Sequence, residues 1–148
     1  MENFLTATKL HASAKRFMDT YSAAMQPLSR EFSIAQTAAD ILLFLANNPE
    51  NRTAKDICAM RHLKPSIVSL HVESLVSQGL LARKSVPGDR RKLRLEPTEQ
   101  AAPIIARGRQ MQEHFAQALT QGLSPDDLSC FSRCMETISR NLECAASL

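Results

Sequence analysis

Apolar residues recur at three- and four-residue intervals through residues 65–78, in the middle of the chain. That spacing places them on one face of an α-helix, with small and polar residues on the other faces. The stripe consists of Val68, Val72, Leu75 and Val76. Pro65 suits the first helical position, where no backbone N–H is needed, and Gly79 suits the end. The pattern predicts a short helix with a defined start and stop.

A β-hairpin is predicted directly after this helix. Residues 81–86 and 92–95 have the composition of two short strands, and turn-forming residues lie between them: Pro87, Gly88 and Asp89. Three cations stand at the tip of the hairpin or just beyond it: Arg90, Arg91 and Lys92. The middle of the chain is therefore predicted to be a helix followed by a basic hairpin.

Two helices are predicted near the N-terminus. Residues 3–26 carry large apolar side chains at helical intervals and form a long helix that ends near Pro27. Ser33 and Gln36 have the spacing of a capping box at the start of a second helix, residues 34–47. The apolar residues of this second helix are nearly continuous, so it is expected to be buried on more than one side.

A third helix is predicted at residues 54–61. Thr53 and Asp56 fit a capping box, in which each side chain bonds the backbone N–H of the other residue. The inward residues are expected to be Ile57 and Cys58, with Met60 as a further candidate. With a turn at residues 62–64, this helix and the one at residues 65–78 make a helix-turn-helix.

Two further helices are predicted after the hairpin. The first begins at Thr98 and runs to about Gln121, where Gly122 caps it, and Pro103 in its second turn is expected to kink it or delay its start. Residues 124–127, Ser-Pro-Asp-Asp, form a strong start for the second, with a capping hydroxyl, a first-turn proline and two acids at the positive end of the helix dipole. An apolar stripe follows: Leu128, Phe131, Met135, Ile138 and Leu142.

The composition agrees with a mainly α protein. The chain has 148 residues, no Trp and few other aromatic residues, so its helices would pack through aliphatic side chains. The length suits a single domain with its own core. No apolar run is long enough to span a bilayer, and residues 1–10 lack the apolar core of a signal peptide, so a cytoplasmic protein is expected.

Positive charge is concentrated in the middle of the chain. Residues 51–95 contain ten Lys or Arg against three Asp or Glu, a net charge of +7, whereas the whole chain has +3 and the remaining residues therefore −4. A basic middle with mildly acidic ends is typical of a nucleic-acid-binding module. A solvated charged face is the ordinary alternative, but here the charge coincides with a helix and hairpin whose shape fits a DNA groove.

One series of residues has the order and spacing of a known DNA-binding motif: Val68, Ser69, Val72, Leu75, Gly79, Leu80, Leu81 and Arg83, then Asp89, Arg90 and Arg91. It resembles the winged helix-turn-helix of the multiple antibiotic resistance regulator (MarR) family. In that family a V-[ST]-x-x-V-x-x-L recognition helix precedes G-L-[IL]-x-R and a D-x-R wing. The resemblance covers about a quarter of the chain, and the order of the surrounding helices fits it as well.

The resemblance implies a fold and an assembly. The fold would be mainly α, a winged helix-turn-helix with a two-stranded wing and N- and C-terminal dimerisation helices. Residues 1–148 would form a single MarR-like domain, with residues 30–96 as the DNA-binding part and residues 1–29 and 97–148 as the dimerisation helices. The protein would be a homodimer that binds double-stranded DNA at a palindromic operator, most often as a repressor. A small anionic aromatic or lipophilic effector would bind between the dimerisation helices and the winged module.

The candidate DNA-binding residues lie on the central helix and the hairpin: Lys64, Ser66, Ser69, Leu70, Arg83, Lys84, Asp89, Arg90, Arg91 and Lys92. The two serines can hydrogen-bond bases or phosphates, and Leu70 can touch a thymine methyl group. The family often has a basic residue where Leu70 stands, so one of its contacts is expected to be missing here. Asp89 is expected to fix the guanidinium of Arg91 for contact with a phosphate. Glu73 would repel phosphates unless a neighbouring arginine pairs with it.

Four cysteines leave a second mechanism open: Cys58, Cys130, Cys134 and Cys144. A reducing compartment argues against structural disulfides, and most of these thiols are expected to be buried. Cys130 and Cys134 share a helix face, so a redox-sensing regulator of the same fold is an alternative. A protein-interaction module that does not bind DNA is another. No cofactor, metal site, nucleophile–base pair or phosphate-binding loop is indicated, so an enzyme is not expected.

Overall fold

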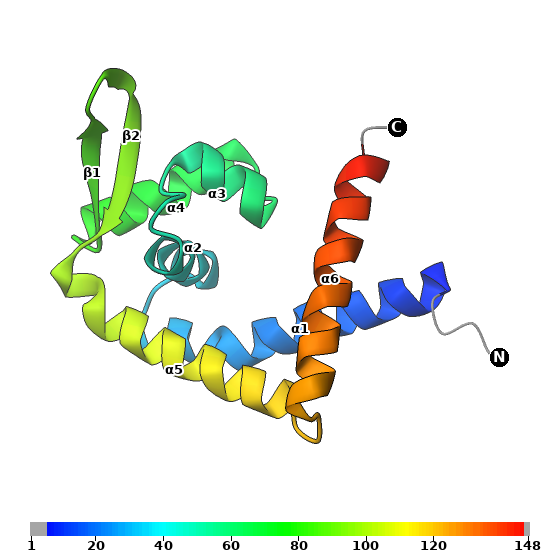
Figure 1. Cartoon of the computed structure of the whole chain (residues 1–148). Coiled ribbons are helices and arrows are strands. Elements are labelled where there is room, and N and C mark those ends of the chain that lie inside the picture. The colour runs from blue at the N-terminus through cyan, green and yellow to red at the C-terminus, as the bar shows by residue number, and fades with distance from the viewer. Residues whose placement is uncertain (1–5, 147–148) are drawn as a thin grey trace. The chain divides into compact units, whose positions relative to one another are not determined.

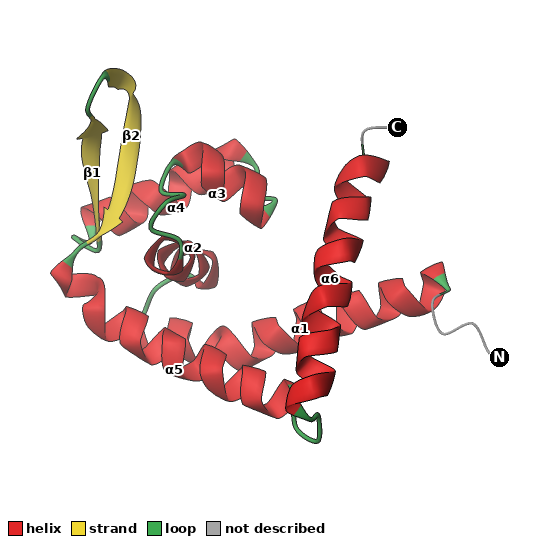
Figure 2. Ribbon diagram, viewed as in Figure 1, coloured by secondary structure: helices red, strands yellow, loops and turns green. Residues whose placement is uncertain are grey.

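The computed structural model describes residues 6–146 (Figure 1). Its helices are α1 (Ala7–Phe32), α2 (Gln36–Asn47), α3 (Ala54–Arg61), α4 (Pro65–Ser77), α5 (Ala102–Leu119) and α6 (Pro125–Ala145). Its strands are β1 (Leu81–Val86) and β2 (Asp89–Pro97), and a 3-10 turn (Glu99–Ala101) precedes α5. The predicted mainly α fold with a two-stranded wing is confirmed (Figure 2). The first residues of the predicted N-terminal helix, 3–5, lie outside the described part.

The chain divides into two compact units, one ending at Glu113 and one beginning at His114. The first contains α1 to α4, the wing formed by β1 and β2, and most of α5. The second contains the end of α5 and all of α6. The candidate DNA-binding residues all belong to the first unit.

α2 is the centre of the core of the first unit. Seven of its twelve residues are buried, and Ile41, Leu42 and Leu45 have no exposed surface. The helix contacts α1, α4 and β2, and Figure 1 shows it between α1 and the α3–α4 pair. The prediction that this helix is buried on more than one side is confirmed.

The predicted end of the first helix near Pro27 is wrong, because α1 continues to Phe32. Pro27 removes one backbone hydrogen bond from the helix, but its ring lies on the exposed side. Met25 and Leu28, on either side of it, are buried in the core and hold the chain in helical register. The helix ends only at Ser33, which has φ 53° and donates its backbone N–H to Ser29 O.

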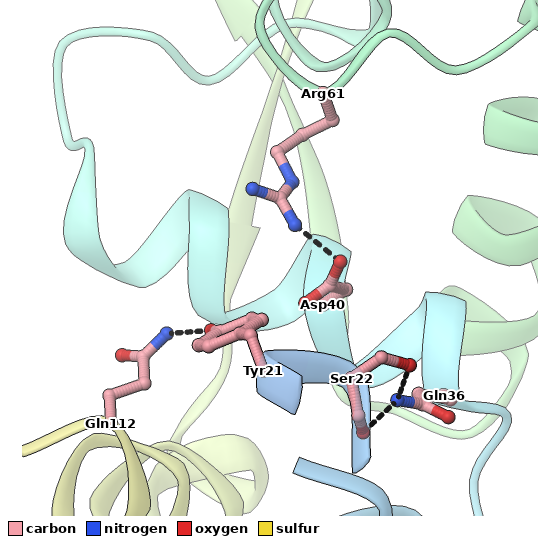
Figure 3. A network of polar contacts seen from close by, with 6 residues as sticks. All are labelled: Tyr21, Ser22, Gln36, Asp40, Arg61 and Gln112. Atoms are coloured by element: carbon pink, nitrogen blue, oxygen red, sulfur yellow. Dashed lines mark hydrogen bonds and ion pairs between the residues drawn. The ribbon is translucent and has the colours of Figure 1, made fainter. Parts of the chain in front are cut away.

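The predicted capping box of Ser33 and Gln36 is also wrong. Ser33 terminates α1, and α2 begins at Gln36 after Ala35, without a side-chain cap. The Gln36 amide instead donates to Ser22 of α1, at 2.8 Å to the carbonyl oxygen and 3.0 Å to the hydroxyl (Figure 3). Its side chain therefore joins α2 to α1 and does not cap a helix.

The start of α3 is the predicted one. The Asp56 N–H donates to Thr53 Oγ1 at 3.1 Å, and the Thr53 N–H donates to Asp56 Oδ2 at 2.9 Å. The Thr53 hydroxyl also donates to this carboxylate, and that bond holds the pKa of Asp56 below its ordinary value, with Lys92 and Lys55 acting in the same direction. Ile57 is buried as predicted and Cys58 is half-buried. Met60 is 49% exposed, so it does not join the core.

The wing is longer than predicted on its second strand. β2 begins at Asp89, immediately after a two-residue turn of Pro87 and Gly88, and Gly88 has a φ of 85° that glycine adopts without strain. The strands pair antiparallel, with Leu81 opposite Pro97, but the register shifts between Ser85 and Val86. This irregularity accommodates residues 90–92 in the longer strand. The wing is tied to the loop before α3 by a 2.7 Å bond from Leu95 N–H to Arg52 O.

Two guanidinium groups bind the C-terminal end of α2. The last carbonyl groups of a helix lack partners within it and carry partial negative charge. Arg52 Nε donates to Leu45 O at 3.2 Å, and Arg109 Nη2 of α5 donates to Ala46 O at 2.9 Å. These bonds fasten α2 to the loop before α3 and to α5.

α5 approaches the core most closely at Gly108. A Cβ added to this buried glycine would lie 2.6 Å from Leu43 Cδ2 and 3.1 Å from Leu28 Cδ2. Both distances are well inside ordinary van der Waals separation, so the absence of a side chain at Gly108 lets α5 pack against α1 and α2. The predicted delay by Pro103 is confirmed, since the 3-10 turn comes first and α5 starts at Ala102.

The second unit contains the predicted capping box at the start of α6. The Asp127 N–H donates to Ser124 Oγ at 3.2 Å, and the Ser124 N–H donates to Asp127 Oδ2 at 2.9 Å. The hydroxyl of Ser124 also donates to this carboxylate, and these bonds lower the pKa of Asp127. The helix therefore begins at Pro125 because of local sequence alone.

α6 exposes its whole length, including its apolar stripe and its cysteines. The stripe residues have exposed fractions of 37% (Leu128), 61% (Phe131), 42% (Met135), 42% (Ile138) and 64% (Leu142). Cys130, Cys134 and Cys144 are exposed and all four cysteines are free, so the prediction that most thiols are buried is wrong. It failed because α6 has no buried residue in the described chain. Across residues 6–146, no helix combines the length and apolar character required to cross a membrane.

Gly108→Ala is expected to lower the free energy of unfolding by about 1–3 kcal/mol, the usual cost of overpacking a core. The loss should appear although alanine is favoured over glycine in helices by about 1 kcal/mol. Urea unfolding at fixed protein concentration measures it. The matched control is Ala106→Gly, at an exposed position of α5, where alanine should be the more stabilising residue. A Gly108→Ala protein as stable as the wild type would contradict the close packing of α5.

Candidate nucleic-acid interface

α4 presents one face to the core and the opposite face to solvent. Val68, Val72 and Leu75 of the predicted stripe are buried, and Val76 is half-buried. Pro65 occupies the first turn as predicted, and no side chain caps the helix. Because the stripe packs inward, the face of α4 that carries Ser66, Ser69 and Leu70 must point outward.

The outward face of α4 exposes apolar side chains and serine hydroxyl groups and carries no Lys or Arg. Between Pro65 and Ser77 the sequence has neither Lys nor Arg. Ser66 and Ser69 are exposed, Leu70 is 63% exposed, and Ile67 beside it is 38% exposed. Ile67 is absent from the candidates chosen by sequence. Its spacing of three residues from Leu70, off the buried stripe, is the signal that could have identified it.

Glu73, the one acidic residue of α4, is paired with Arg83. Arg83 of β1 places Nη2 2.6 Å from Glu73 Oε2. The expectation that a neighbouring arginine would neutralise this carboxylate is confirmed. Arg83 is thereby held against α4, so part of its hydrogen-bonding capacity is already used.

Other cations among residues 51–95 also bind groups of the same chain. Lys84 Nζ lies 2.6 Å from Glu96 Oε2, and this contact with Lys84 lowers the pKa of Glu96. Arg94 donates to Pro49 O at 2.9 Å. Arg61, at the end of α3, forms an ion pair with Asp40 of α2 (Figure 3). These side chains stabilise the fold, together with Arg52, which lies in the loop before α3 and binds the end of α2.

The Asp89 carboxylate contacts the main chain of the wing. Asp89 Oδ1 accepts the backbone N–H of Arg91 at 3.0 Å. The expected role of this carboxylate was to fix the guanidinium of Arg91, and the observed bond fixes its backbone. A carboxylate two residues before an N–H forms this local bond readily, which is why Asp is common in turns. The guanidinium of Arg91 remains exposed.

Four residues among 51–95 have a charged side-chain group without a hydrogen bond or ion pair to any residue that the structure describes: Lys55, Lys64, Arg91 and Lys92. All four are exposed. Lys55 and Lys92 both lie near enough to Asp56 to lower its pKa, so the N-terminal end of α3 and the wing are close together. Lys55 is missing from the candidates chosen by sequence, which took residues only from the central helix and hairpin. The side chain of Arg90 is not described.

A cavity of about 440 Å³ lies between α3, α4 and the wing. Its lining is mostly apolar and includes Cys58 of α3, Val68 and Val72 of α4, and Leu93 and Leu95 of β2. Its polar lining residues are Lys55, Ser69 and Arg83. Two candidate DNA-binding residues therefore also line a cavity large enough for a small organic molecule.

The sequence model of the MarR family matches residues 33–92, which include every candidate DNA-binding residue and the first part of the wing. The winged helix-turn-helix of this chain is that of the MarR family. Proteins of this family are DNA-binding transcriptional regulators and not enzymes, so the predicted family and its general function are confirmed.

Solved structures of MarR proteins share the fold of this chain. One is a MarR-family regulator from Listeria monocytogenes in complex with a 26-mer DNA, with 12% identity, a TM-score of 0.78 and coverage of 88% of this chain and 87% of that one. Another is the S. aureus MepR–DNA complex, with 19% identity, a TM-score of 0.72 and coverage of 95% and 99%. A third is MarR from Oenococcus oeni, with 17% identity, a TM-score of 0.70 and coverage of 88% and 98%. At these identities the likeness shows the MarR fold.

Proposed function

We propose that this MarR-family regulator binds double-stranded DNA as a homodimer, with α4 of each copy in the major groove, and that a small effector releases it. The proposal rests on one difference among the cations of residues 51–95: some are paired within the chain and others are not. Lys55, Lys64, Arg91 and Lys92 are left without partners in the described chain, at the starts of α3 and α4 and in the wing. Exposed cations on a winged helix-turn-helix are suited to phosphate contacts.

The proposed roles follow from this division. Lys64 and Lys92 contact phosphates, and Arg91 addresses a phosphate or the minor groove. Ser66 and Ser69 hydrogen-bond bases or phosphates, and Leu70 touches a base. Further roles belong to four residues of the wing: Arg83, Lys84, Asp89 and Arg90. Arg83 and Lys84 add weaker long-range attraction because Glu73 and Glu96 already neutralise them. Asp89 sets the backbone of the wing tip, and Arg90 contributes sequence-independent charge.

The homodimer is proposed from the apolar surface of the terminal helices. Besides the stripe of α6, three large apolar side chains of α1 are exposed: Leu10 (49%), Phe17 (44%) and Met18 (62%). Apolar rows of this length are unusual on a monomer and are typical of association surfaces. They lie within residues 1–29 and 97–148, the ranges that the resemblance to the MarR family implies for dimerisation, outside the implied DNA-binding part at residues 30–96. Two copies related by a two-fold axis would read a palindromic operator.

An effector site is proposed in the cavity between α3, α4 and the wing. Its apolar lining with Lys55 and Arg83 suits a small anionic compound with an aromatic or lipophilic body. This place differs from the crevice beside the dimerisation helices that the sequence resemblance implies. A ligand here would compete with DNA for Lys55 and Ser69, so it would bind free protein better than operator-bound protein. Release by such a ligand makes the protein a repressor wherever its operator overlaps a promoter.

Arg91→Ala is expected to weaken binding to every DNA sequence by roughly 1–2 kcal/mol per subunit, because a charge-assisted phosphate contact is lost. The slope of log affinity against log salt should fall by about 0.9 for each contact removed. Mobility shifts on a selected operator and on random DNA at several salt concentrations test both effects. Arg133→Ala, an exposed arginine of α6 outside the DNA-binding part, should leave the slope unchanged. An unchanged slope for Arg91→Ala would remove the wing from the proposed mechanism.

Phe131→Asp is expected to convert the dimer to monomer at micromolar concentration, because it places a charge in the exposed apolar stripe of α6. Ser129→Asp is the matched control: the same helix receives the same charge, on the face away from the stripe. Sedimentation equilibrium distinguishes the two variants. A wild-type chain that sediments only as a monomer would refute the dimer, and a Phe131→Asp dimer would show that α6 is not its interface.

Benzoate, used as a probe, is expected to bind the DNA-free protein in the millimolar range and to release it from its operator. Benzamide has the same shape without the charge and should do neither. Lys55→Gln should weaken benzoate binding in a calorimetric titration without DNA, because one of the two cations of the cavity is lost.

The redox alternative is tested with peroxide. Release from the operator by peroxide that disappears in a Cys130→Ser, Cys134→Ser double variant would favour it, since both thiols are exposed on one face of α6.

A further inference from the structure

The helix α4 of this protein exposes a pair of large apolar side chains. Four large hydrophobic residues are exposed in the described part of the winged module: Met60, Ile67, Leu70 and Leu93. Two of them, Ile67 and Leu70, stand three residues apart on α4. Side chains at this spacing are neighbours on a helix surface, with Cβ atoms about 5–6 Å apart. They form one apolar patch at the place where a MarR helix enters the major groove.

The two serines and the glutamate beside Leu70 on α4 carry little sequence information. Ser66 and Ser69 have hydroxyls that can donate to or accept from several bases. Glu73 is the only charged residue of the helix, and one of its carboxylate oxygens is 2.6 Å from Arg83 Nη2. The side chains that recognise guanine and adenine by paired hydrogen bonds are Arg, Lys, Asn and Gln, and none of them occurs between Pro65 and Ser77.

The apolar feature of the major groove is the methyl group on C5 of thymine. We infer that Leu70, with Ile67 beside it, reads thymine methyl groups, and that these contacts supply most of the base discrimination of this protein. The inference rests on the proposed placement of α4 in the major groove. Each operator half-site then carries thymines at the position facing Leu70 and at a neighbouring base pair facing Ile67. Burial of the methyl groups removes both partners from water, which is the source of the affinity.

Replacement of thymine by deoxyuracil tests this contact, because it removes the methyl group and leaves every hydrogen-bonding group in place. An operator is first selected from random DNA with the full-length protein, and each thymine is then replaced in turn. At one or two positions per half-site, the replacement should weaken binding by about fourfold, the factor that corresponds to burying one methyl group. Uracil at the other positions should change affinity less than twofold.

Variants of Leu70 assign the effect to this residue. In Leu70→Ala the uracil penalty at the facing thymine should disappear, while Leu70→Met, which keeps an apolar side chain of similar volume, should retain most of it. Met60→Ala is the matched control, since Met60 is 49% exposed in the same module but lies on α3. Its uracil penalties should equal those of the wild type. Leu70 is exposed, so these variants should unfold at the same urea concentration as the wild type.

Three outcomes would overturn the inference, and they differ in what else they affect. A specific operator without any uracil-sensitive thymine would remove methyl reading and leave the proposed function standing. A uracil penalty that persists unchanged in Leu70→Ala would assign the effect to the stiffness of the DNA and not to this side chain. Failure to select any specific operator would refute the proposed placement of α4 and the inference together.

Discussion

The burial of α2 is the constraint that determines the rest of the first unit. Its buried side chains face α1, α4 and β2 at once, so each of these elements is positioned against the same helix. The stripe of α4 packs inward, and the opposite face is therefore presented to solvent. α5 joins this core only because Gly108 has no side chain to collide with Leu43. The orientation of the proposed DNA-reading face of α4 thus follows from hydrophobic packing behind it, which explains why that face itself can be free of buried or stabilising residues.

Helix starts were predictable where the signal is contained in a few neighbouring residues. The capping boxes of α3 and α6 require only a hydroxyl and a carboxylate three residues apart, and Pro65 needs no partner at all. The failures lie where distant residues decide. α1 passes Pro27 because Met25 and Leu28 are buried against other helices, and no local pattern reports that burial. Gln36 could cap its own helix by sequence, but in the folded chain it meets Ser22, fourteen residues away.

Charge and motif selected candidate residues that all lie on α4, the wing and the turn before α4, but which of their charges are paired within the chain was not predictable. A net charge counts every cation equally. The structure separates Arg61 and Arg94, whose side chains hold the fold together, from Lys55 and Arg91, whose charged groups have no partner in the described chain. The distinction depends on whether a carboxylate or carbonyl from another element comes within reach, and only the folded chain determines that. The same applies to Asp89, whose position in the motif is compatible with a bond to either the backbone or the guanidinium of the wing.

The pairing of Glu73 with Arg83 affects which parts of the protein would supply DNA affinity and which would distinguish between bases. An unpaired carboxylate on α4 would repel phosphates, and an unpaired arginine there would attract every DNA sequence alike. With the two charges neutralised at 2.6 Å, α4 adds little sequence-independent attraction. In the proposed complex the cations of the wing and of the starts of α3 and α4 supply affinity, while the surface of α4 distinguishes bases by short-range contact. In the proposed homodimer each half-site is read once, so a discrimination of about fourfold per methyl group in one subunit becomes about sixteenfold in the pair. Weak individual contacts are therefore sufficient for a palindrome.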